Sequence, residues 1–576
     1  MRREEPDRSC EASAIVAFVR IDGWIGELRS LRGESGTGAA GKKLAILGAL
    51  SRESIRDNVP GARERILRLA AELLFLRAHP DDERILVAVS GELSRFSERI
   101  TPRLAKQLRG SGLPGTAIVY PFDLPVARWI RRRFPDAAEL DWRGAPRVRR
   151  LQDLLPALAG AAEEIALVDE YVGTREWAEH ARGDNSALAW LVDRLDALPL
   201  TARLRDALYD SLGIRVSFRV EDRASKTGAC RLGAPIVFHS GPMFRHVPDL
   251  RAHLAESNVR SRRARGREAE RLVDLARGAL CVRSREMNPI SNANPEDVVL
   301  HSLERGVEIV TYGVSPERRL LLESLWGFLI LKNGVPVGYG SASLLFSSAE
   351  IAVNVFDEFR KGESAFIFAE LLRILRHHFG AASFTLLESQ FGGDGDEEGI
   401  RSGAFWFYDR LGFRHVSREL RGLAEKERKR LAAAPGRRSP PGLLRKLASA
   451  PLVFSLNEKV RSGGGTVWWG RLGVAATSFI AKEGRGDREK AMRTARLRVE
   501  RALAERIPSD RLAGELCAVL SLLPDLPSWS GAEKRALAGI IGAKAGESER
   551  EFALKLSRHT RLEDELISLI DQEEPV

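Results

Sequence analysis

Apolar residues recur along this chain with two spacings, which separate the expected helices from the expected strands. Between residues 62 and 77 apolar side chains fall every three or four positions, and this predicts an amphipathic helix. Two further helices are expected at 126–134 and 187–198. Short apolar runs that predict strands lie at 85–89, 116–120 and 216–220. We therefore expect residues 61–215 to form a mixed α/β or largely helical domain.

The densest strand signals lie in the middle of the chain. The segment 307–314 alternates between apolar and polar residues, as a half-buried strand does. Apolar runs at 325–331 and 335–344 flank Asn333-Gly334. This dipeptide is a strong hairpin signal, because both residues tolerate the positive φ of a type I′ turn. The next run, 350–356, is expected to lie beside the hairpin and complete an antiparallel set.

The strand at 350–356 leads into a turn at 357–365 and then into an expected helix at 366–379. A strand that runs directly into a small-residue turn and a helix start leaves several backbone N–H groups unpaired and directed at one spot. Such a spot holds an anion, most simply a phosphate. A strand at 383–388 and an aromatic-rich helix at 404–413 are expected to follow.

Proline and glycine interrupt the pattern after a charged helix expected at 419–434. Residues 435–442 are rich in both and indicate a linker. Helical spacing resumes near residue 486, and Ser530 followed by Glu533 is a good helix start. The expected segments are a poorly structured part at 1–60, a domain at 61–215, connecting strands and a charged helix at 216–289 that either link to or belong to the next domain, a strand-rich domain at 290–420, a linker region at 421–485 and a small helical domain at 486–576.

The composition is that of a globular protein of several domains. The chain has 576 residues, of which 44% are hydrophobic and 29% charged. No apolar run approaches the ~20 residues that a membrane helix needs, and no signal-type apolar segment follows the N-terminus. The four cysteines stand far apart without a CxxC pair, which argues against a disulfide framework and against a zinc site. We expect a cytoplasmic protein with reduced thiols and no membrane partner.

The net charge of +11 permits several partners and specifies none. The segment 260–267 contains five arginines and is expected to lie in a long charged helix that begins near Pro248. Such a run can neutralise nucleic-acid phosphates. Acidic residues follow it at once, at Glu268 and Glu270, so a solvated helix face is the favoured interpretation and nucleic acid is the alternative.

Residues 36–43 match the GxxxxGK core of a nucleotide-binding P-loop. No buried apolar strand precedes them, and Lys43 stands where the magnesium-binding hydroxyl belongs. A further apolar run at 165–168 ends in Asp169-Glu170, like the strand that holds magnesium in such enzymes. We interpret 36–43 as a flexible glycine-rich connector, with a nucleotide hydrolase as the minor alternative.

The hairpin, the strand, an arginine-bearing turn, a helix, a second strand and a final aromatic helix ending in Leu411-Gly412-Phe413 together resemble the GNAT superfamily of N-acetyltransferases. The resemblance covers about residues 290–420. It implies a mixed sheet flanked by helices, and hence an α/β (α+β) chain with further N-terminal and C-terminal domains. It also implies that acetyl-CoA, or another acyl-CoA, is the donor substrate, that an amine attacks its thioester directly, and that no metal takes part. The acceptor amine is not specified.

The resemblance also assigns donor-binding residues. The family turn runs Arg/Gln-x-x-Gly-x-Gly/Ala and is matched here by 360–365. The residues implied to bind the donor's phosphates are Arg360, Lys361, Gly362, Ser364 and Ala365. Glu363 replaces the middle glycine, and its carboxylate either faces the pyrophosphate, which it would repel, or turns away from it at the helix N-terminus. The strands on either side of the helix are implied to splay apart, so that the backbone of Val353 and Val355 binds the pantetheine arm as an added strand.

Three residues are candidates for catalysis. Tyr408 stands five residues before Phe413, like the family's tyrosine that protonates the departing thiolate. A phenol of pKa ~10 is protonated at neutral pH and can donate to a thiolate of pKa ~8.5. The alternative for Tyr408 is a structural role in an aromatic cluster. Glu350 and Glu388 are the candidates for the base that takes a proton from the amine.

The acidic stretch 392–399 lacks the spacing of a calcium loop and is expected to be a mobile loop that selects a cationic amine. His377 and His378 end a helix, and no metal site is expected there. Two functions follow. The first is an acyl-CoA-dependent N-acyltransferase, with acetyl transfer to an amine as its expected reaction. The second is a non-catalytic binding or regulatory protein of the GNAT fold, with nucleic acid as one partner to consider.

Overall fold

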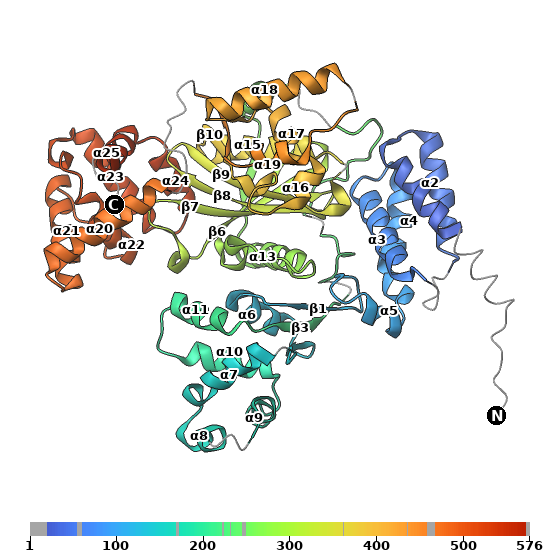
Figure 1. Cartoon of the computed structure of the whole chain (residues 1–576), viewed down its shortest axis with the longest axis horizontal. Helices are drawn as coiled ribbons and strands as arrows, with labels where there is room; N and C mark the ends of the chain where they lie inside the picture. The colour runs from blue at the N-terminus through green and yellow to red at the C-terminus, as the bar shows by residue number, and fades with distance from the viewer. Residues whose placement is uncertain are drawn as a thin grey trace.

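A nine-stranded mixed sheet forms the centre of the computed structural model, which describes residues 20–53, 60–143, 145–168, 172–221, 224–230, 232–244, 249–360, 362–434, 436–457 and 467–571. The strand order is β11-β12-β10-β9-β8-β7-β6-β5-β4 (Figure 1). The strands are β4 (Arg260–Arg263), β5 (Ala293–Ser302), β6 (Val307–Val314), β7 (Ser324–Lys332), β8 (Val335–Leu345), β9 (Ser348–Val355), β10 (Ser383–Leu386), β11 (Arg414–His415) and β12 (Leu452–Ser455). Neighbours are antiparallel except β9 and β10, which run parallel. The expected mixed α/β class is confirmed.

The β7–β8 hairpin forms as its sequence predicts. Asn333 has a φ of 50° and Gly334 a φ of 75°, the left-handed backbone that both residues tolerate. The Asn333 side chain also fastens the turn, because Nδ2 donates to the carbonyls of Ala78 at 2.9 Å and Val237 at 3.0 Å. β9 pairs with β8 along its whole length and completes the expected antiparallel set.

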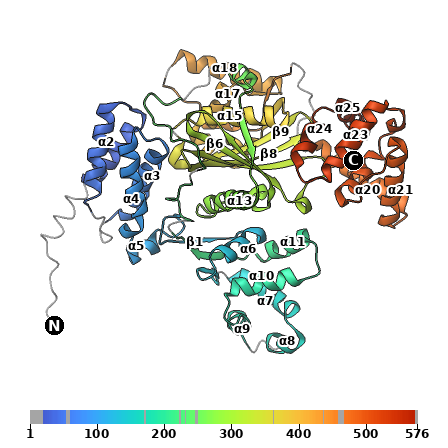
Figure 2. The ribbon, with the colours of Figure 1, turned by 180° about the vertical axis from the view of Figure 1, so that it is seen from behind.

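Helices cover both faces of the sheet, with α13 (Gly266–Cys281) on one side and α15 (Ser364–Phe379) on the other in both views (Figures 1 and 2). α15 is buried over the whole run from Ala365 to Leu375. α12 (Leu250–Ala255) packs against α15, so α15 is a core helix rather than a surface helix. Its only charged residues in that run, Glu370 and Arg373, pair with each other at 2.6 Å.

The N-terminal helices belong to the same hydrophobic core as the sheet. They are α2 (Thr37–Leu50), α3 (Ala62–Ala78), α4 (Glu83–Ser94) and α5 (Pro102–Gln107). Two expectations are wrong here. The glycine-rich segment 36–43 is not a connector but the start of α2, where Lys43 is buried and pairs with Asp81 at 2.8 Å. The run 85–89 lies within α4 rather than in a strand, because Asp82 caps a helix by accepting from the Ile85 N–H at 2.9 Å.

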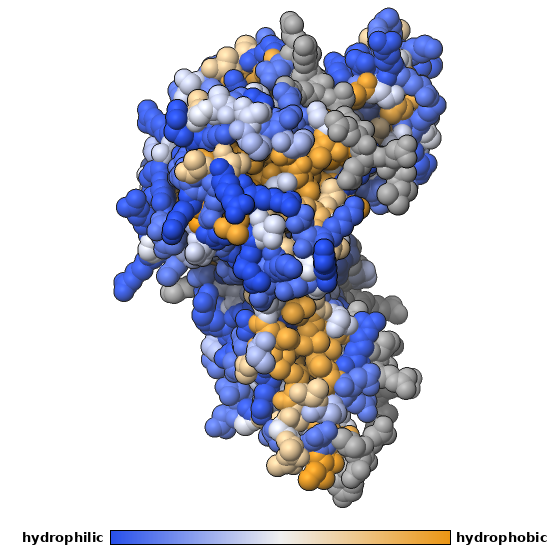
Figure 3. All heavy atoms as spheres, turned by 90° about the vertical axis from the view of Figure 1, so that its left-hand side faces the viewer, coloured by the Kyte–Doolittle hydropathy of each residue, from blue (hydrophilic) through white to orange (hydrophobic). Residues whose placement is uncertain are grey.

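A second core is built around a small antiparallel sheet of β1 (Ala117–Tyr120), β2 (Ala138–Leu140) and β3 (Val216–Arg219), in the order β1-β3-β2. Six helices surround it: α6 (Leu124–Arg133), α7 (Ala145–Leu158), α8 (Ala161–Val168), α9 (Thr174–Ala181), α10 (Ala187–Ala197) and α11 (Ala202–Leu212). We refer to residues 117–219 as the lower lobe, since it projects below the main body and carries a stripe of apolar surface (Figure 3). The run 165–168 ends α8 and is not a strand, while Asp169 and Glu170 lie outside the described residues.

The connecting region differs from its expected form. The apolar run 235–238 predicts one of the connecting strands expected at 216–289, but it forms none. The single charged helix expected from Pro248 is instead α12, the exposed edge strand β4 and α13, and Pro248 itself lies outside the described residues. The first half of the arginine-rich run thus forms the exposed strand β4 rather than one face of a helix. Within it, Arg262 pairs with Glu268 at 2.6 Å. Lys and Arg at a sheet edge discourage pairing with other chains.

The C-terminal helices form a third core: α20 (Val467–Gly484), α21 (Arg488–Leu503), α22 (Arg511–Leu520), α23 (Gly531–Lys544), α24 (Glu549–Leu556) and α25 (Thr560–Asp571). The capping box at Ser530 and Glu533 is confirmed. Helical spacing over 549–570 predicts one helix, but the chain there is divided into α24 and α25.

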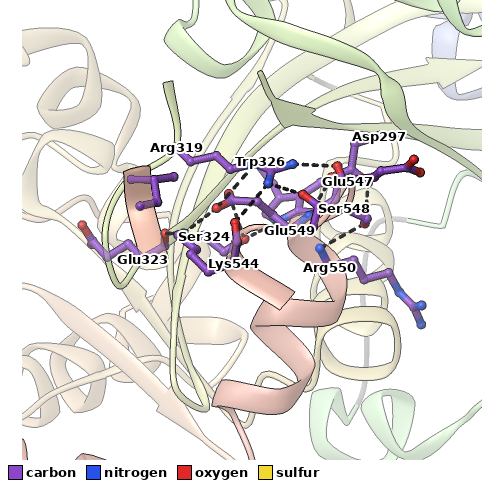
Figure 4. Close-up of polar contacts among 12 residues, drawn as sticks. Asp297, Arg319, Glu323, Ser324, Trp326, Lys544, Glu547, Ser548, Glu549 and Arg550 are labelled. Atoms are coloured by element: carbon purple, nitrogen blue, oxygen red, sulfur yellow. Dashed lines mark hydrogen bonds and ion pairs between the residues drawn. The ribbon is translucent and has the colours of Figure 1, made fainter. Parts of the chain in front are cut away.

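Buried polar contacts fasten this third unit to the sheet (Figure 4). Lys544 and Glu549 are both fully buried and form an ion pair. Arg319 donates to the carbonyls of Lys544 at 3.2 Å and Glu547 at 2.6 Å. From β5, Asp297 accepts the Glu549 N–H at 3.0 Å. The loop between α23 and α24 is thus bonded directly to the strand region.

The described cysteines form no disulfide bond. Cys230, Cys281 and Cys517 are unpaired and buried, and Cys10 lies outside the described residues. Among the helices that the structure describes, none is long and apolar enough to cross a membrane.

Candidate functional site

The parallel strands β9 and β10 pair over only part of their length. Ser348, Ala349 and Glu350 of β9 face Ser383, Phe384 and Thr385 of β10. Beyond this point β9 continues to Val355, whereas β10 ends at Leu386 and the chain turns into the short helix η7 (Glu388–Gln390). The two strands therefore separate after Glu350.

A cavity of about 100 Å³ lies where the strands separate. Its lining residues are Leu325, Ser341, Ser343, Glu350, Ile351, Ala352, Leu387, Ser389 and Gln390. β8 contributes Ser341 and Ser343, which lie two positions apart and so share one face of the strand, whereas β9 contributes three consecutive residues.

The backbone of β9 presents hydrogen-bonding groups to this gap. The Val353 N–H donates to Gln390 Oε1 at 2.9 Å, so it points away from β8. Alternation along the strand directs the polar groups of Val355 the same way, and its carbonyl accepts from Arg360 Nε at 3.2 Å. Two of the expected backbone positions thus face the gap, and the Gln390 side chain occupies one of them.

Glu350 is a half-buried carboxyl among other carboxyls. Burial raises the pKa of Glu350, and the negative charges of Glu323 and Glu388 raise it further. Glu323 is held by Ser343, whose hydroxyl donates to it at 3.0 Å. Of the two candidate bases, Glu350 lines the cavity and Glu388 lies behind it at the start of η7. A carboxyl with a raised pKa in a cavity suits proton transfer near neutral pH.

The turn after β9 leaves free N–H groups at the start of α15. The first hydrogen bond of the helix runs from the Ile367 N–H to the Glu363 carbonyl. The N–H groups of Ser364, Ala365 and Phe366 make no hydrogen bond with another described residue. Such groups, together with the helix dipole, favour an anion.

Crowding explains the glycine in this turn. A Cβ on Gly362 would lie 3.1 Å from the Phe359 carbonyl oxygen and 3.4 Å from the His79 ring. Arg360 is exposed and pairs with Asp357 at 2.8 Å and with Glu398. Lys361, the other expected cation, lies outside the described residues.

The Glu363 carboxylate turns away from the helix start into a buried cluster. Its Oε2 lies 2.6 Å from Lys332 Nζ and its Oε1 lies 2.6 Å from Arg305 Nη2. Burial alone would raise the pKa of Glu363, but the Lys332 charge and the hydrogen bonds from Lys332 and Arg305 outweigh it and lower the pKa to about 2. The carboxylate is therefore already neutralised and does not face the free N–H groups.

Tyr408 lies in α17 (Ala404–Arg410), within an aromatic cluster of Phe368, Phe407 and Phe413. Burial raises its pKa, so the phenol stays protonated. Its hydroxyl has no hydrogen-bond partner among the residues that the structure describes, and it does not line the cavity next to Glu350. The structure thus separates Tyr408 from that cavity.

The acidic stretch and the paired histidines have structural partners. Glu397 pairs with Arg445 at 3.0 Å, and Glu398 with Arg360. His377 bonds the Leu254 carbonyl at 2.9 Å, while burial lowers the pKa of His378 to about 3. Within the described part of the chain, no three His, Cys, Asp or Glu residues are placed to hold a metal ion.

Three residues of this site have no sequence signal that identifies them. Gln390 reaches Val353 only because η7 follows β10, and Glu323 and Ser343 meet only through the pairing of β7 with β8. Comparisons with protein-family models, with curated proteins and with solved structures found no match for this chain.

Proposed function

We propose that this chain is an acyl-CoA-dependent N-acyltransferase that transfers an acyl group, in the simplest case acetyl, to an amine. One observation carries the proposal: the pairing of β9 with β10 ends beside a cavity that Glu350 lines, with the Val353 N–H directed into the gap. An extended amide-containing arm can add to such a free edge as a further strand. The free N–H groups at the start of α15 lie on the same strand–turn–helix unit and suit its phosphates.

The proposed reaction is a single displacement. The amine nitrogen attacks the thioester carbonyl carbon, the new C–N bond forms, and the C–S bond breaks. Glu350 takes the proton that the nitrogen loses, for which its raised pKa suits it. The departing thiolate takes its proton from solvent, because Tyr408, the donor that the resemblance implies, does not line the cavity at Glu350. Glu323 and Glu388 add negative charge near Glu350, which favours a cationic amine as acceptor.

Binding of the donor is the first test. Acetyl-CoA that binds only the folded chain must raise its melting temperature, by an amount that grows with ligand concentration. Isothermal titration of the full chain with acetyl-CoA gives the affinity directly. A melting temperature that acetyl-CoA leaves unchanged at millimolar concentration would exclude the proposal.

A second candidate is a non-catalytic GNAT-fold protein that binds or regulates. Two contacts favour it: Gln390 already occupies the Val353 N–H, and Arg360 is paired with Asp357 and Glu398. The exposed arginines of β4 are the surface to test for nucleic acid. Release of free thiol from acetyl-CoA in the presence of a panel of amines separates the two, because only the transferase releases it.

A further inference from the structure

A second cavity lies between the lower lobe and the main body. It measures about 510 Å³. α6 and α11 supply its wall from the lower lobe, and α13, α14 (Asn288–Ser291), the start of β5 and the short helix η5 (Pro316–Arg318) supply the other wall. Figure 1 shows the lower lobe beneath α13, where these elements face one another. It shares no lining residue with the cavity at Glu350, so it is a separate site.

Arginine dominates this cleft. The five arginines that line it are Arg128, Arg132, Arg205, Arg277 and Arg318. Two are neutralised by carboxylates, since Arg128 forms a bidentate pair with Asp196 and Arg318 lies 2.6 Å from Asp206. For the other three, no ion pair forms within the part of the chain that the structure describes.

The remaining three guanidinium groups keep unused donors. Arg277 donates only to carbonyls, those of Ile290 at 3.3 Å and Ser291 at 2.9 Å. Arg205 donates to the Asp196 carbonyl at 2.7 Å, but its buried Nε has no partner in the described chain. Arg132 is exposed on α6. A buried donor without a partner is costly, so native proteins seldom leave one unless a ligand or water completes it.

The charges around Arg277 and the hydroxyl group of Ser291 also bear on what this cleft can bind. Burial lowers the pKa of Arg277, and the nearby charge of Arg132 lowers it further. The charges of Asp274 and Asp123 raise this pKa, although neither carboxylate forms an ion pair with Arg277 in the described structure. An anion between Arg277 and Arg132 would relieve that repulsion. The Ser291 hydroxyl lies near Asp123 but meets no partner with hydrogen-bond geometry, although Ser291 is only 1% exposed.

We propose that this cleft binds a small organic phosphate monoester. Guanidinium groups from α6 and α11 on one wall and from α13 on the other line the same cleft, and the three outer oxygens of a phosphate can accept more of their hydrogen bonds than a flat carboxylate can. Apolar lining from Pro125, Trp129 and Ala293 suits the organic part. The volume lies within the range of small-molecule sites and is too small for a folded partner. This site does not depend on acyl transfer.

Titration of the full chain with inorganic phosphate and with phenyl phosphate tests the proposal. We expect both to bind, and phenyl phosphate to bind several-fold more tightly because its ring adds contact with the apolar wall. Arg132→Gln should weaken both at least about tenfold, since it removes a charge-assisted hydrogen bond from an exposed side chain that the fold does not need. Arg132→Lys keeps the positive charge but not the two parallel N–H donors of a guanidinium. Its affinities should lie between those of the native chain and those of Arg132→Gln.

Two controls locate the binding. Arg133→Gln changes the next residue of α6, whose guanidinium lies over Phe134 and outside the cleft, and should leave both affinities unchanged. Arg360→Gln should also leave them unchanged, which separates this site from the start of α15. The proposal is overturned if neither compound binds, if Arg132→Gln binds as tightly as the native chain, or if only Arg360→Gln abolishes binding. None of these outcomes depends on whether acetyl-CoA binds.

Discussion

The Nζ atom of Lys332 lies 2.6 Å from Oε2 of Glu363, and both side chains are almost wholly buried. Lys332 ends β7, and Glu363 precedes the first residue of α15. With Arg305, whose Nε donates to Glu363 at 2.8 Å, the pair joins two strand turns to the start of the central helix. The carboxylate that replaces a glycine in this turn is therefore part of the internal packing.

Glu363→Gln should destabilise the fold strongly. The variant removes the only carboxylate that pairs with Lys332 in the described structure, so a buried cation loses its counter-charge, at a cost of about 3 kcal/mol. Urea denaturation at pH 7 measures the free energy of unfolding. Glu398→Gln is the matched control, because its partner Arg360 is exposed and the loss should stay below about 1 kcal/mol. Equal losses in the two variants would contradict the prediction.

The same carboxylate predicts how stability depends on pH. Its pKa is about 2 in the folded chain against an ordinary 4.5, so its contribution is complete above pH 4.5 and is lost as the pH falls toward 2. The difference in free energy of unfolding between the native chain and Glu363→Gln should therefore shrink by about 3 kcal/mol over that interval. Denaturant titrations at pH 6, 4.5, 3 and 2 measure it. A constant difference would show that Glu363 is not the group responsible.

Glu350→Gln should lower kcat of the proposed acyl transfer by about 10²–10⁴-fold, because the amine loses its base. Protonation disables that base, and the pKa of Glu350 is raised, so activity should fall on the acid side at a pH above the ordinary carboxyl value of 4.5. Glu323→Gln removes one of the charges that raise this pKa. It should move the acid limb of the pH–rate profile to lower pH while kcat at neutral pH changes little. An unmoved acid limb would exclude this coupling.

Gln390→Ala should tighten acetyl-CoA binding several-fold under the proposed function. The side chain accepts the hydrogen bond of the Val353 N–H, so a donor amide must displace it first. Isothermal titration with acetyl-CoA measures the change. Ser389→Ala, which alters the neighbouring residue of the same cavity, is the control and should leave the affinity near that of the native chain. Weaker binding by Gln390→Ala would contradict the prediction, because it would mean that the Gln390 side chain binds acetyl-CoA rather than blocking the Val353 N–H.

Lys544→Met should loosen the C-terminal helices from the sheet. Glu549 would keep only the more distant Arg319, at 4.0 Å, as a cation in the described structure, and losing the close one costs about 3 kcal/mol. Limited proteolysis should then cut between the sheet domain and α20 at a protease concentration that leaves the native chain intact. Lys555→Met is the matched control in the same unit, since its pair with Glu551 is exposed. Similar cleavage of both variants would rule out this role for Lys544.

Local signals in the sequence were enough for the hairpin, the strand–turn–helix unit and most helices. Asn333-Gly334 predicts its turn because the required backbone angles are a property of those two residues. The segment 85–89 is a wrong prediction for the opposite reason: five apolar residues fit a strand or a buried helix equally, and the decisive cap, Asp82, lies outside the run. The run at 452–456, expected in a linker, is short and isolated, and only pairing with β10 and β11 makes it a strand.

The candidate site was predictable only in part. The expected residues on β9 and in the turn belong to one continuous strand–turn–helix unit. Glu350 could be predicted as part of the site because it lies on the strand of that unit. Gln390, Glu323 and Ser343 join the site through contacts between distant segments, and the direction of the Glu363 side chain depends on Lys332 and Arg305. None of these contacts leaves a periodic trace in the sequence. The arginine cleft likewise combines four separate stretches of chain.

The place of β12 has a consequence for how this chain is synthesised. β12 lies between β10 and β11, yet residues 387–451 separate it from β10. While a ribosome makes those residues, the outer edge of β10 has no partner, and closing so long a loop is slow. An unpaired strand edge invites association between chains. Changes that weaken β12 should therefore lower the yield of soluble protein more than its final stability would suggest.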